Sequence, residues 1–371
     1  MSAHVPGGRD TAPGGRPRAR ALGIPFPGTP GRHNCVTDVA GVEVGVVTLL
    51  GGEEGPGRGP AVRTGVTAIF PRGRSGAARA VLAGYHALNG NGEMTGTAWI
   101  QEHGYMTGPI MLTSTNSVGV VRDATAAWLR RRFADLGVPA WLPVVGETWD
   151  GYLHDIDGCH VTARHVDQAL DGARGGPVEH GSVGGGTGMI CYEYKGGNGG
   201  ASRRIRAAGE DWTVGVHLQT NFGNRLQLTV AGIPVGTRLR EGRIFEGEHG
   251  SVIGVVVTDA PLLGQQLTRL ARRVALGLAR TGAIGGSESG DLFLAVSTAN
   301  DGAMDVLGKR SVEFLHDHEM DPLFTAVVEA TEESVIDSMV VNDAMTGVEG
   351  RRVPALPIEE LLAELRHHRR V

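Results

Sequence analysis

A six-residue apolar run, residues 252–257, follows directly on Gly250 and Ser251, and it constrains the fold more than any other stretch of the chain. Apart from one glycine, every residue in the run is β-branched. This pattern is typical of a strand buried on both faces. The approach to it, residues 246–250, is polar and contains glycine. The chain therefore needs a sheet that is covered on both faces, with a buried strand starting near Ser251.

A serine at the head of a buried strand is well placed to become a new chain terminus. If the Gly250–Ser251 bond is cut, Ser251 carries both a hydroxyl nucleophile and a free α-amine with a pKa of about 7.7–8.0. That amine can act as the base that activates the hydroxyl. As a dipeptide alone, Gly-Ser is more often only a turn before a strand. Gly181-Ser182 is a rival junction, although glycines follow it where a buried strand is expected.

Composition excludes several classes of protein. A net charge of -5 leaves no basic footprint, so a nucleic-acid partner is not expected. The three cysteines form no Cys-x-x-Cys motif, which argues against a disulfide framework or a structural zinc site. No apolar run approaches membrane-spanning length, and residues 1–22 have arginines but no apolar core behind them, unlike a secretory signal. We therefore expect a disordered leader over 1–22, no membrane partner and a cytoplasmic location.

Strand and helix patterns alternate along the rest of the chain. Runs rich in β-branched and apolar residues predict strands at 41–50, 65–70, 141–145, 189–194, 212–220, 251–257 and 292–296. Capping residues and apolar periodicity predict helices at 76–88, 123–135, 259–282, 321–347 and 358–370. Several strands, followed by alternating helix, strand and helix, predict sheets layered between helices.

The glycine-rich stretch 182–188 invites comparison with a dinucleotide-binding loop. Such loops open a helix, whereas this one leads into the strand predicted at 189–194. We therefore interpret its glycines as sites where two backbones, or a backbone and a substrate, approach closely.

Three separated motifs, residues 249–263, 285–300 and 184–192, together resemble the DmpA-type aminopeptidases, a family that includes L-aminopeptidase/D-Ala-esterases and β-peptidyl aminopeptidases. The resemblance extends from about residue 23 to 347. It implies an α/β fold, a four-layer αββα sandwich similar to that of N-terminal-nucleophile hydrolases but with different (DOM-type) strand connectivity. It further implies a single domain over 23–371 that cuts itself into an α chain (1–250) and a β chain (251–371), assembled as a homotetramer of αβ units.

The resemblance also implies roles for particular residues. Ser251 matches the nucleophile, and Asn221 matches an asparagine that stabilises the oxyanion through its amide N–H. Ser289 and Asp291 match a serine and an acid that hold the nucleophile and its amine, although the acid is glutamate in some relatives. Two further residues would contact the substrate. Glu147 matches a carboxylate that receives the free amine, and Trp149 falls where some relatives carry a tyrosine.

Each of these residues also has a purely structural explanation. Asn221 is typical of a turn before Gly223, Ser289 and Asp291 can cap backbone groups in a glycine loop, and Glu147 can be a surface acid. The histidine pairs His316/His318 and His367/His368 lie in polar stretches without a third ligand at a familiar spacing. They predict solvated side chains, and the sequence predicts no metal.

The sequence therefore predicts a self-processing aminopeptidase that uses Ser251, forms an acyl-enzyme and needs no cofactor. Its substrates would be small peptides or aminoacyl amides and esters. One alternative is an acyltransferase of the ornithine-acetyltransferase type, although those enzymes usually present threonine as the nucleophile. The other alternative is a binding protein that keeps the fold and never cleaves.

Overall fold

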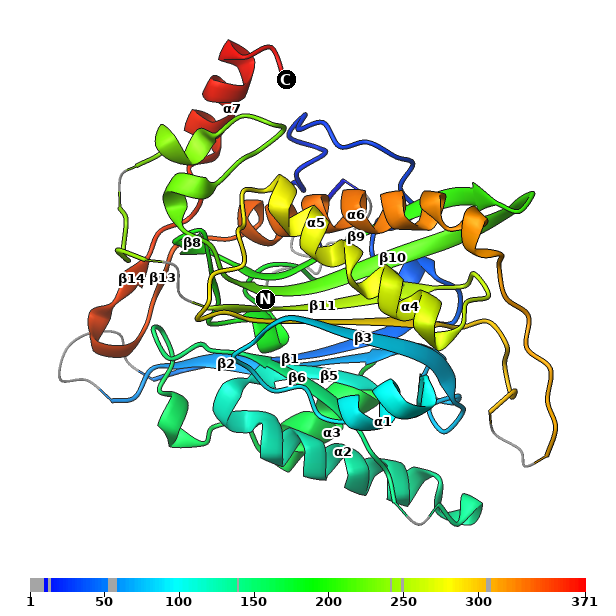
Figure 1. The fold of residues 1–371 in the computed structure, drawn as a ribbon. Helices are drawn as coiled ribbons and strands as arrows, with labels where there is room; N and C mark the ends of the chain where they lie inside the picture. Colours follow the sequence, from blue (N-terminus) through cyan, green and yellow to red (C-terminus); the bar gives the residue numbers. More distant parts are fainter. Residues whose placement is uncertain are drawn as a thin grey trace.

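Two β-sheets lie face to face, and helices cover the outer face of each sheet (Figure 1). The computed structural model describes residues 10–12, 15–52, 59–138, 140–240, 242–247, 250–304 and 308–371. The layers follow the order helix, sheet, sheet, helix, which confirms the four-layer α/β sandwich expected from the sequence.

The larger sheet has six strands in the order β4-β3-β12-β11-β10-β9. Its central pair, β11 and β12, is parallel, and every other neighbouring pair is antiparallel. A parallel pair needs a crossover connection, and two helices between β11 and β12 provide it. The strand bounds are β3 Val81–Gly90, β4 Tyr105–Met106, β9 Gly197–Ala207, β10 Glu210–Asn221, β11 Ser251–Thr258 and β12 Gly290–Ser297.

The smaller sheet has four strands in the order β1-β2-β5-β6, with only β5 and β6 parallel. Its strands are β1 Glu43–Gly51, β2 Val62–Phe70, β5 Ile110–Ser114 and β6 Val144–Thr148. Two short hairpins lie outside the main sheets, formed by β7 Ile190–Cys191 with β8 Tyr194–Lys195 and by β13 Met345–Thr346 with β14 Arg352–Val353.

The helices divide between the two outer layers. α2 and α3 pack on the smaller sheet, and α4, α5 and α6 pack on the larger one (Figure 1). α1 lies beside β3, and α7 is close to the C-terminus. Their bounds are α1 Thr97–His103, α2 Val118–Arg132, α3 Ala163–Asp171, α4 Gly264–Ala271, α5 Arg273–Arg280, α6 Asp321–Val340 and α7 Ile358–His367.

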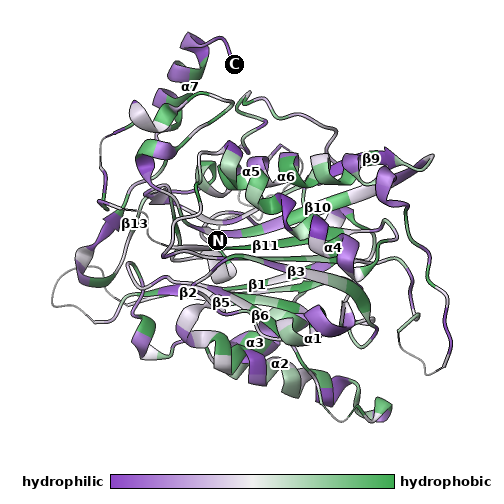
Figure 2. Ribbon diagram, in the orientation of Figure 1, coloured by the Kyte–Doolittle hydropathy of each residue, from purple (hydrophilic) through white to green (hydrophobic). Residues whose placement is uncertain are grey.

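Side chains of β11 alternate between two cores because successive residues of a strand point to opposite faces. Ile253, Val255 and Val257 pack between the sheets, whereas Val252 and Val256 pack against the helices. All residues of β11 are buried, and Figure 2 shows a hydrophobic stretch along this strand and hydrophilic stretches on α7. Ser251 shares the parity of Ile253, so its side chain lies on the face toward the other sheet.

The helix predicted at 76–88 is wrong, because β3 occupies Val81–Gly90. At Gly84 an added Cβ would lie 2.1 Å from the backbone nitrogen of Thr268, so α4 packs directly on this strand. Pairing with β12 therefore outweighs the local helical pattern. The helix predicted at 259–282 is also interrupted. Asp259 accepts a hydrogen bond from the Thr213 N–H at 2.7 Å instead of capping a helix, and α4 and α5 are separated at Arg272.

Within the expected disordered leader, Arg18 and Ala19 are buried, which corrects that expectation for these two residues. Arg18 is buried, and its Nε donates to Asp337 of α6 at 2.8 Å. The Ala19 N–H donates to the same carboxylate at 2.8 Å. The ion pair between Arg18 and Asp337, together with its hydrogen bonds, offsets the hydration that both charges lose on burial. Composition alone does not reveal such a pairing. Residues 1–9 and 13–14 of the leader lie outside the described residues.

Candidate active site

Ser251 is the first residue of β11 and is buried between two neighbouring strands. It pairs with Asn221 at the end of β10 and with Gly290 at the start of β12. Its Oγ is buried and has no hydrogen-bond partner. A buried hydroxyl without a partner is uncommon in folded proteins and often marks a functional site. The hydroxyl proposed as nucleophile is thus held in place by the strand, while its Oγ remains uncommitted.

Gly250, on the other side of the proposed scissile bond, adopts φ +132°, a conformation that side chains rarely allow. An added Cβ would lie 1.6 Å from the backbone oxygen of Asn221. Only glycine therefore fits the junction as it is folded. Glu248 and His249 of the polar approach lie outside the described residues.

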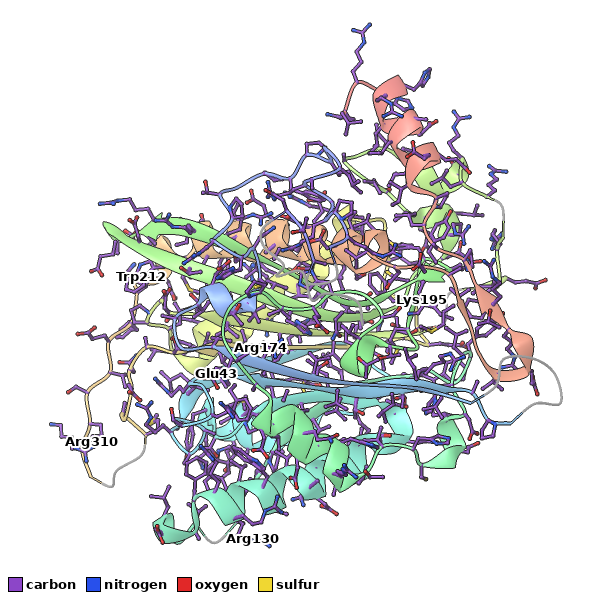
Figure 3. All side chains as sticks on the ribbon, turned by 180° about the vertical axis from the view of Figure 1, so that it is seen from behind. Glu43, Arg130, Arg174, Lys195, Trp212 and Arg310 are labelled. Atoms are coloured by element: carbon purple, nitrogen blue, oxygen red, sulfur yellow. The ribbon has the colours of Figure 1, made fainter. Side chains whose placement is uncertain are left out.

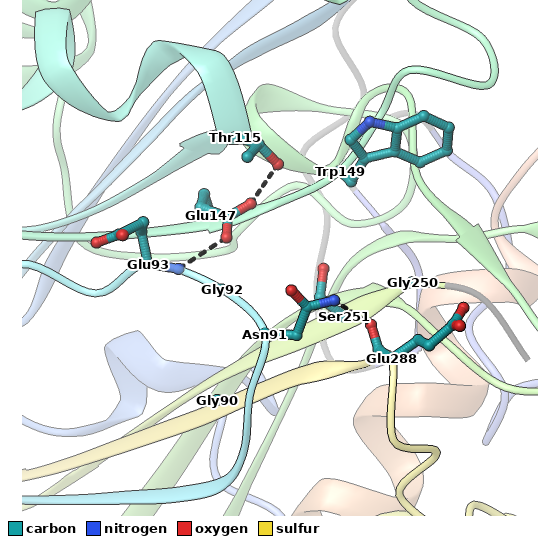
Figure 4. Close-up of a pocket in the computed structure, with 10 residues that line it drawn as sticks. All are labelled: Gly90, Asn91, Gly92, Glu93, Thr115, Glu147, Trp149, Gly250, Ser251 and Glu288. Atoms are coloured by element: carbon teal, nitrogen blue, oxygen red, sulfur yellow. Dashed lines mark hydrogen bonds between the residues drawn. The ribbon is translucent and has the colours of Figure 1, made fainter.

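A cavity of about 780 Å³ opens at this junction, and Ser251 and Gly250 form part of its wall. Figure 4 shows Glu147 and Thr115 across the cavity from Ser251, with Trp149 at its edge. The residues that line it are Gly90, Asn91, Gly92, Glu93, Thr115, Glu147, Trp149, Gly250, Ser251 and Glu288. Three of them carry carboxylates and none carries a basic side chain. A ligand with a positive charge is therefore favoured over an anion.

Glu147, in β6, is only 3% exposed, so it is not the surface acid that the sequence allowed. One carboxylate oxygen accepts the Glu93 backbone N–H at 2.9 Å, and the other accepts the Thr115 hydroxyl (Figure 4). Burial raises the pKa of Glu147, whereas these two hydrogen bonds lower it. The carboxylate is fixed in the cavity wall, where it can pair with a substrate ammonium.

Asn221 is anchored by both ends of its side-chain amide. Its oxygen accepts the Ile190 N–H at 2.8 Å, and its Nδ2 donates to the Trp149 carbonyl at 2.8 Å. A Cβ on Gly250 would lie 3.2 Å from this Nδ2, so the amide is next to the proposed scissile bond. Trp149 itself is 44% exposed at the cavity edge. Its backbone, as well as its side chain, therefore contributes to the site.

Ser289 and Asp291 form a buried pair at the start of β12. The Ser289 hydroxyl donates to Asp291 at 2.5 Å, and Asn89 donates to the other oxygen of Asp291 at 3.1 Å. Burial raises the pKa of Asp291, and the bonds from Ser289 and Asn89 lower it. Neither residue hydrogen-bonds to the Ser251 hydroxyl. The pair therefore lies at the start of the strand next to Ser251, but it makes no hydrogen bond to the Ser251 hydroxyl.

Sequence reasoning missed the end of β3, which carries Asn89, and the loop after it, which supplies Asn91 and the Glu93 backbone to the site. The signal was present, because Asn-Gly-Asn-Gly at 89–92 is typical of a turn. Glu288 was missed as well; its carbonyl accepts from Asn91 at 2.6 Å (Figure 4).

Two ionisable groups, Asp150 and Lys195, are buried and do not line the cavity. Burial raises the pKa of Asp150 to about 7 and lowers the pKa of Lys195 to about 7. Ser114 donates to Asp150 at 2.7 Å, and the Lys195 ammonium donates to the Gly196 carbonyl at 2.8 Å. Figure 3 shows Lys195 within the body of the protein, in contrast to Arg130 on the outer side of α2. Burial thus shifts both pKa values toward neutral pH from opposite sides.

The glycine-rich stretch 182–188 lies inside the sandwich rather than at a phosphate site. A Cβ on Gly186 would lie 2.4 Å from the backbone nitrogen of Asn198, and one on Gly185 would lie 2.7 Å from the Leu112 carbonyl. The predicted close approach of backbones is thus confirmed.

Across the described ranges, no group of three or more His, Cys, Asp or Glu side chains is placed to hold a metal ion. No helix within those ranges is long and apolar enough to span a membrane.

Comparisons with known proteins agree with the expected family. The model for peptidase family S58 matches residues 34–353. The β-peptidyl aminopeptidase BapA of Sphingosinicella microcystinivorans is 48% identical in an alignment that spans 375 residues, gaps included. The alignment covers 96% of this chain and 93% of the relative. A solved L-aminopeptidase D-Ala-esterase/amidase from Ochrobactrum anthropi, described as a variant of the Ntn-hydrolase fold, superposes with a TM-score of 0.91. It is 43% identical, and the match covers 96% of this chain and 99% of that one. A Burkholderia β-aminopeptidase gives a TM-score of 0.86 at 46% identity, covering 94% and 98% of the two chains.

Proposed function

The chain belongs to peptidase family S58 and is an N-terminal-nucleophile aminopeptidase, and we propose that Ser251 is its nucleophile. The observation that carries this proposal is the buried, unpartnered Ser251 hydroxyl, which lies in the wall of a cavity directly after a glycine with a positive φ. The family and its aminopeptidase members favour this function over both the acyltransferase and the non-catalytic binding protein.

The first reaction is self-processing. The Ser251 oxygen attacks the Gly250 carbonyl carbon, the C–N bond breaks, and the acyl group moves to the oxygen as an ester while the nitrogen becomes a free amine. Water then hydrolyses the ester. The products are an α chain ending at Gly250 and a β chain beginning at Ser251. The two chains remain one αββα domain, because β11 stays paired with β10 of the other chain.

The second reaction is aminopeptidase turnover. The new α-amine of Ser251 accepts the hydroxyl proton while the oxygen attacks the first carbonyl of the substrate. Asn221 supports the negative charge that develops on that carbonyl oxygen once its Nδ2 turns from the Trp149 carbonyl toward the substrate. The Ser289–Asp291 pair orients Ser251 from the neighbouring strand. The amine product leaves, and water releases the acyl group.

The substrates are short peptides, amides or esters with a free amino terminus, and we propose a preference for N-terminal β-amino residues. The support is the relative at 48% identity and the solved structure at 46% identity, both named for β-amino substrates. Glu147 receives the amine, and Trp149 borders the same space. A β-amino residue carries its amine one carbon further from the scissile carbonyl.

We further propose a homotetramer of αβ units in the cytoplasm, and the family resemblance supports the assembly. The three cysteines are free thiols, which fits a reducing compartment. Size-exclusion chromatography with light scattering tests the assembly.

The decisive experiment for the function is gel electrophoresis of the purified protein. Scaling the 38.9 kDa chain by length, cleavage at Gly250–Ser251 gives fragments of about 26 and about 13 kDa, and Ser251 becomes the amino terminus of the smaller one. Ser251→Ala should remain a single inactive chain. The matched control is Ser182→Ala at the rival Gly-Ser junction, which should process normally. A cleaved and active Ser251→Ala variant would disprove the assignment.

A further inference from the structure

The hairpin of β7 and β8 has an unusual turn. Its two turn residues, Tyr192 and Glu193, have φ of 51° and 61°, the left-handed conformation that a two-residue hairpin turn normally fills with Asn-Gly or Gly-Gly. Both side chains are buried. Neither residue is suited to this conformation by its backbone preference, and strain of this kind persists where a functional geometry requires it.

The strained turn holds the carboxylate of Glu193 in a buried position. It is 1% exposed, and both of its oxygens accept backbone N–H groups. One oxygen accepts from Arg225 at 3.0 Å, and the other accepts from Ile244 at 2.7 Å and from Phe245 at 3.2 Å. The Arg243 guanidinium adds an ion pair at 3.5 Å. A carboxylate that binds several backbone N–H groups fixes a chain segment more firmly than a neutral acceptor does.

The two segments held by Glu193 lead to the two sides of the proposed scissile junction. Ile244 and Phe245 precede Gly250 by a few residues. Arg225 follows shortly after Asn221, the residue that pairs with Ser251. The same hairpin also holds Asn221 directly, because the Ile190 N–H donates to its side-chain oxygen at 2.8 Å.

Packing around Phe245 fixes the segment from its other side. Its ring meets the Tyr152 ring edge-on with centroids 5.1 Å apart. Ile244 and Phe245 both pack against a small apolar cluster that contains Leu153, Ile190 and Val353. Ile244 and Phe245 are therefore held by hydrogen bonds to Glu193 of the hairpin and by apolar contacts with a cluster that includes Ile190 of the same hairpin.

We infer that Glu193 is a positioning residue for self-processing: it fixes Ile244 and Phe245, upstream of Gly250, so that the Gly250 carbonyl stays within reach of the Ser251 hydroxyl. This inference rests on the proposed cleavage at Gly250–Ser251. It assigns Glu193 no part in peptide hydrolysis, since the carboxylate is occupied by backbone donors and does not line the cavity. After cleavage, the Gly250 carbonyl is no longer the group that Ser251 attacks, so the rate of substrate hydrolysis should not depend on the position of Ile244 and Phe245.

The test compares Glu193→Gln with the wild-type chain in pulse–chase translation, followed on a gel. Glutamine keeps the shape but has only one acceptor oxygen, so it must turn its NH₂ toward one set of backbone donors. We expect precursor cleavage to slow by roughly tenfold or more, which corresponds to about 1.4 kcal/mol. Once cleaved, the variant should hydrolyse an aminoacyl p-nitroanilide with kcat and KM close to those of the wild type.

Asp38→Asn is the matched control. Asp38 also accepts two backbone N–H groups, from His33 at 2.9 Å and Cys35 at 3.3 Å, but these lie in a different part of the chain. It should lower the melting temperature without changing the rate of cleavage. A merely structural role for Glu193 predicts the same behaviour in both variants, and this result would overturn the inference.

A second variant, Ile244→Pro, removes one donor and keeps the Glu193 carboxylate with its Arg225 contact. It decides the question if Glu193→Gln does not fold, because slow cleavage is again expected and a wild-type rate would overturn the inference. Failure of the wild-type chain to cleave would contradict the proposed function itself. Slow cleavage in the Glu193 variant beside prompt cleavage in the wild type supports both.

Discussion

Replacing Glu147 by glutamine tests whether the enzyme is an aminopeptidase, which recognises the free amine of its substrate, or a general amidase, which does not. The carboxylate is 3% exposed and is held by the Glu93 N–H and the Thr115 hydroxyl, so it is rigid before a substrate arrives. Glutamine preserves the shape and removes the charge. The expected result is a higher KM with a smaller change in kcat, because the contact with the substrate ammonium exists in both the ground state and the transition state.

The magnitude follows from the burial of the carboxylate. An ammonium about 4 Å away interacts with it by roughly 4 kcal/mol at an effective dielectric near 20. Glu147 has already lost most of its hydration in the free enzyme, so the cost of binding falls mainly on the substrate ammonium. Removing one partner of a buried charged pair costs about 2–5 kcal/mol. At about 3 kcal/mol, kcat/KM should fall by roughly 10²-fold.

The assay uses one aminoacyl p-nitroanilide in free and N-acetylated forms. Wild type should cleave the free form and essentially not the acetylated one, since acetylation removes the charge and leaves Glu147 unpaired. Glu93→Gln keeps the backbone N–H that holds Glu147 and removes a different carboxylate of the cavity lining, so it should raise KM less than Glu147→Gln does. Equal wild-type rates on the two substrates would refute the reasoning.

The pH profile gives an independent readout. The substrate ammonium binds the ionised form of Glu147, so kcat/KM should rise with pH as this carboxyl loses its proton. Burial raises the pKa of Glu147, which places the acid limb at a higher pH than that of an exposed glutamate. In Glu147→Gln this limb should disappear. An unchanged acid limb in the variant would assign the titration to another group.

The other predictions concern the junction and the neighbouring strand. Ser289→Ala should lower kcat by roughly 10²–10⁴-fold, measured on fully processed protein, whereas the exposed Ser287→Ala should leave turnover unchanged; normal turnover in Ser289→Ala would reduce Ser289 to a turn residue. Gly250→Ala should accumulate as precursor on a gel, because the new Cβ would lie 1.6 Å from the Asn221 carbonyl. Gly247→Ala, where a Cβ meets nothing within 4 Å, should cleave like the wild type, and equal cleavage of both variants would show that the Gly250 conformation is not required.

The parts of the fold that the sequence predicts well are those whose burial pattern is local. β11 and β12 are strongly apolar, and both are buried along their whole length. The start of α6 at Asp321 follows from an acid and a proline at the helix N-terminus. α2 begins at Val118, ahead of the predicted Asp123, since the 3-10 turn at Thr115–Ser117 continues directly into it.

The failure at β3 has a different cause. Residues 81–88 contain alanine, leucine and histidine at spacings that fit a helix, and only pairing with β12, some two hundred residues later, makes them a strand. The sequence contains Gly84 but not the position of α4 against it. Because β3 was missed, so was the loop after it, and with it the Glu93 backbone that holds Glu147.

The candidate site shows the same difference between what local sequence patterns predict and what depends on long-range contacts. Family resemblance predicts Ser251, Asn221 and Glu147 as site residues, and they lie on three strands in two different sheets. Their meeting depends on how the sheets face each other. At one such contact, Gly146 lies so close to Ile253 that an added Cβ would be 3.1 Å from its side chain. Spacing along the chain carries no information on that contact. Glu193 would not be found by either route, since an acid after a tyrosine has no special meaning until the turn conformation and its three backbone donors are known. The residues proposed to act on the substrate thus follow from motifs, whereas the role proposed for Glu193 follows only from the folded geometry.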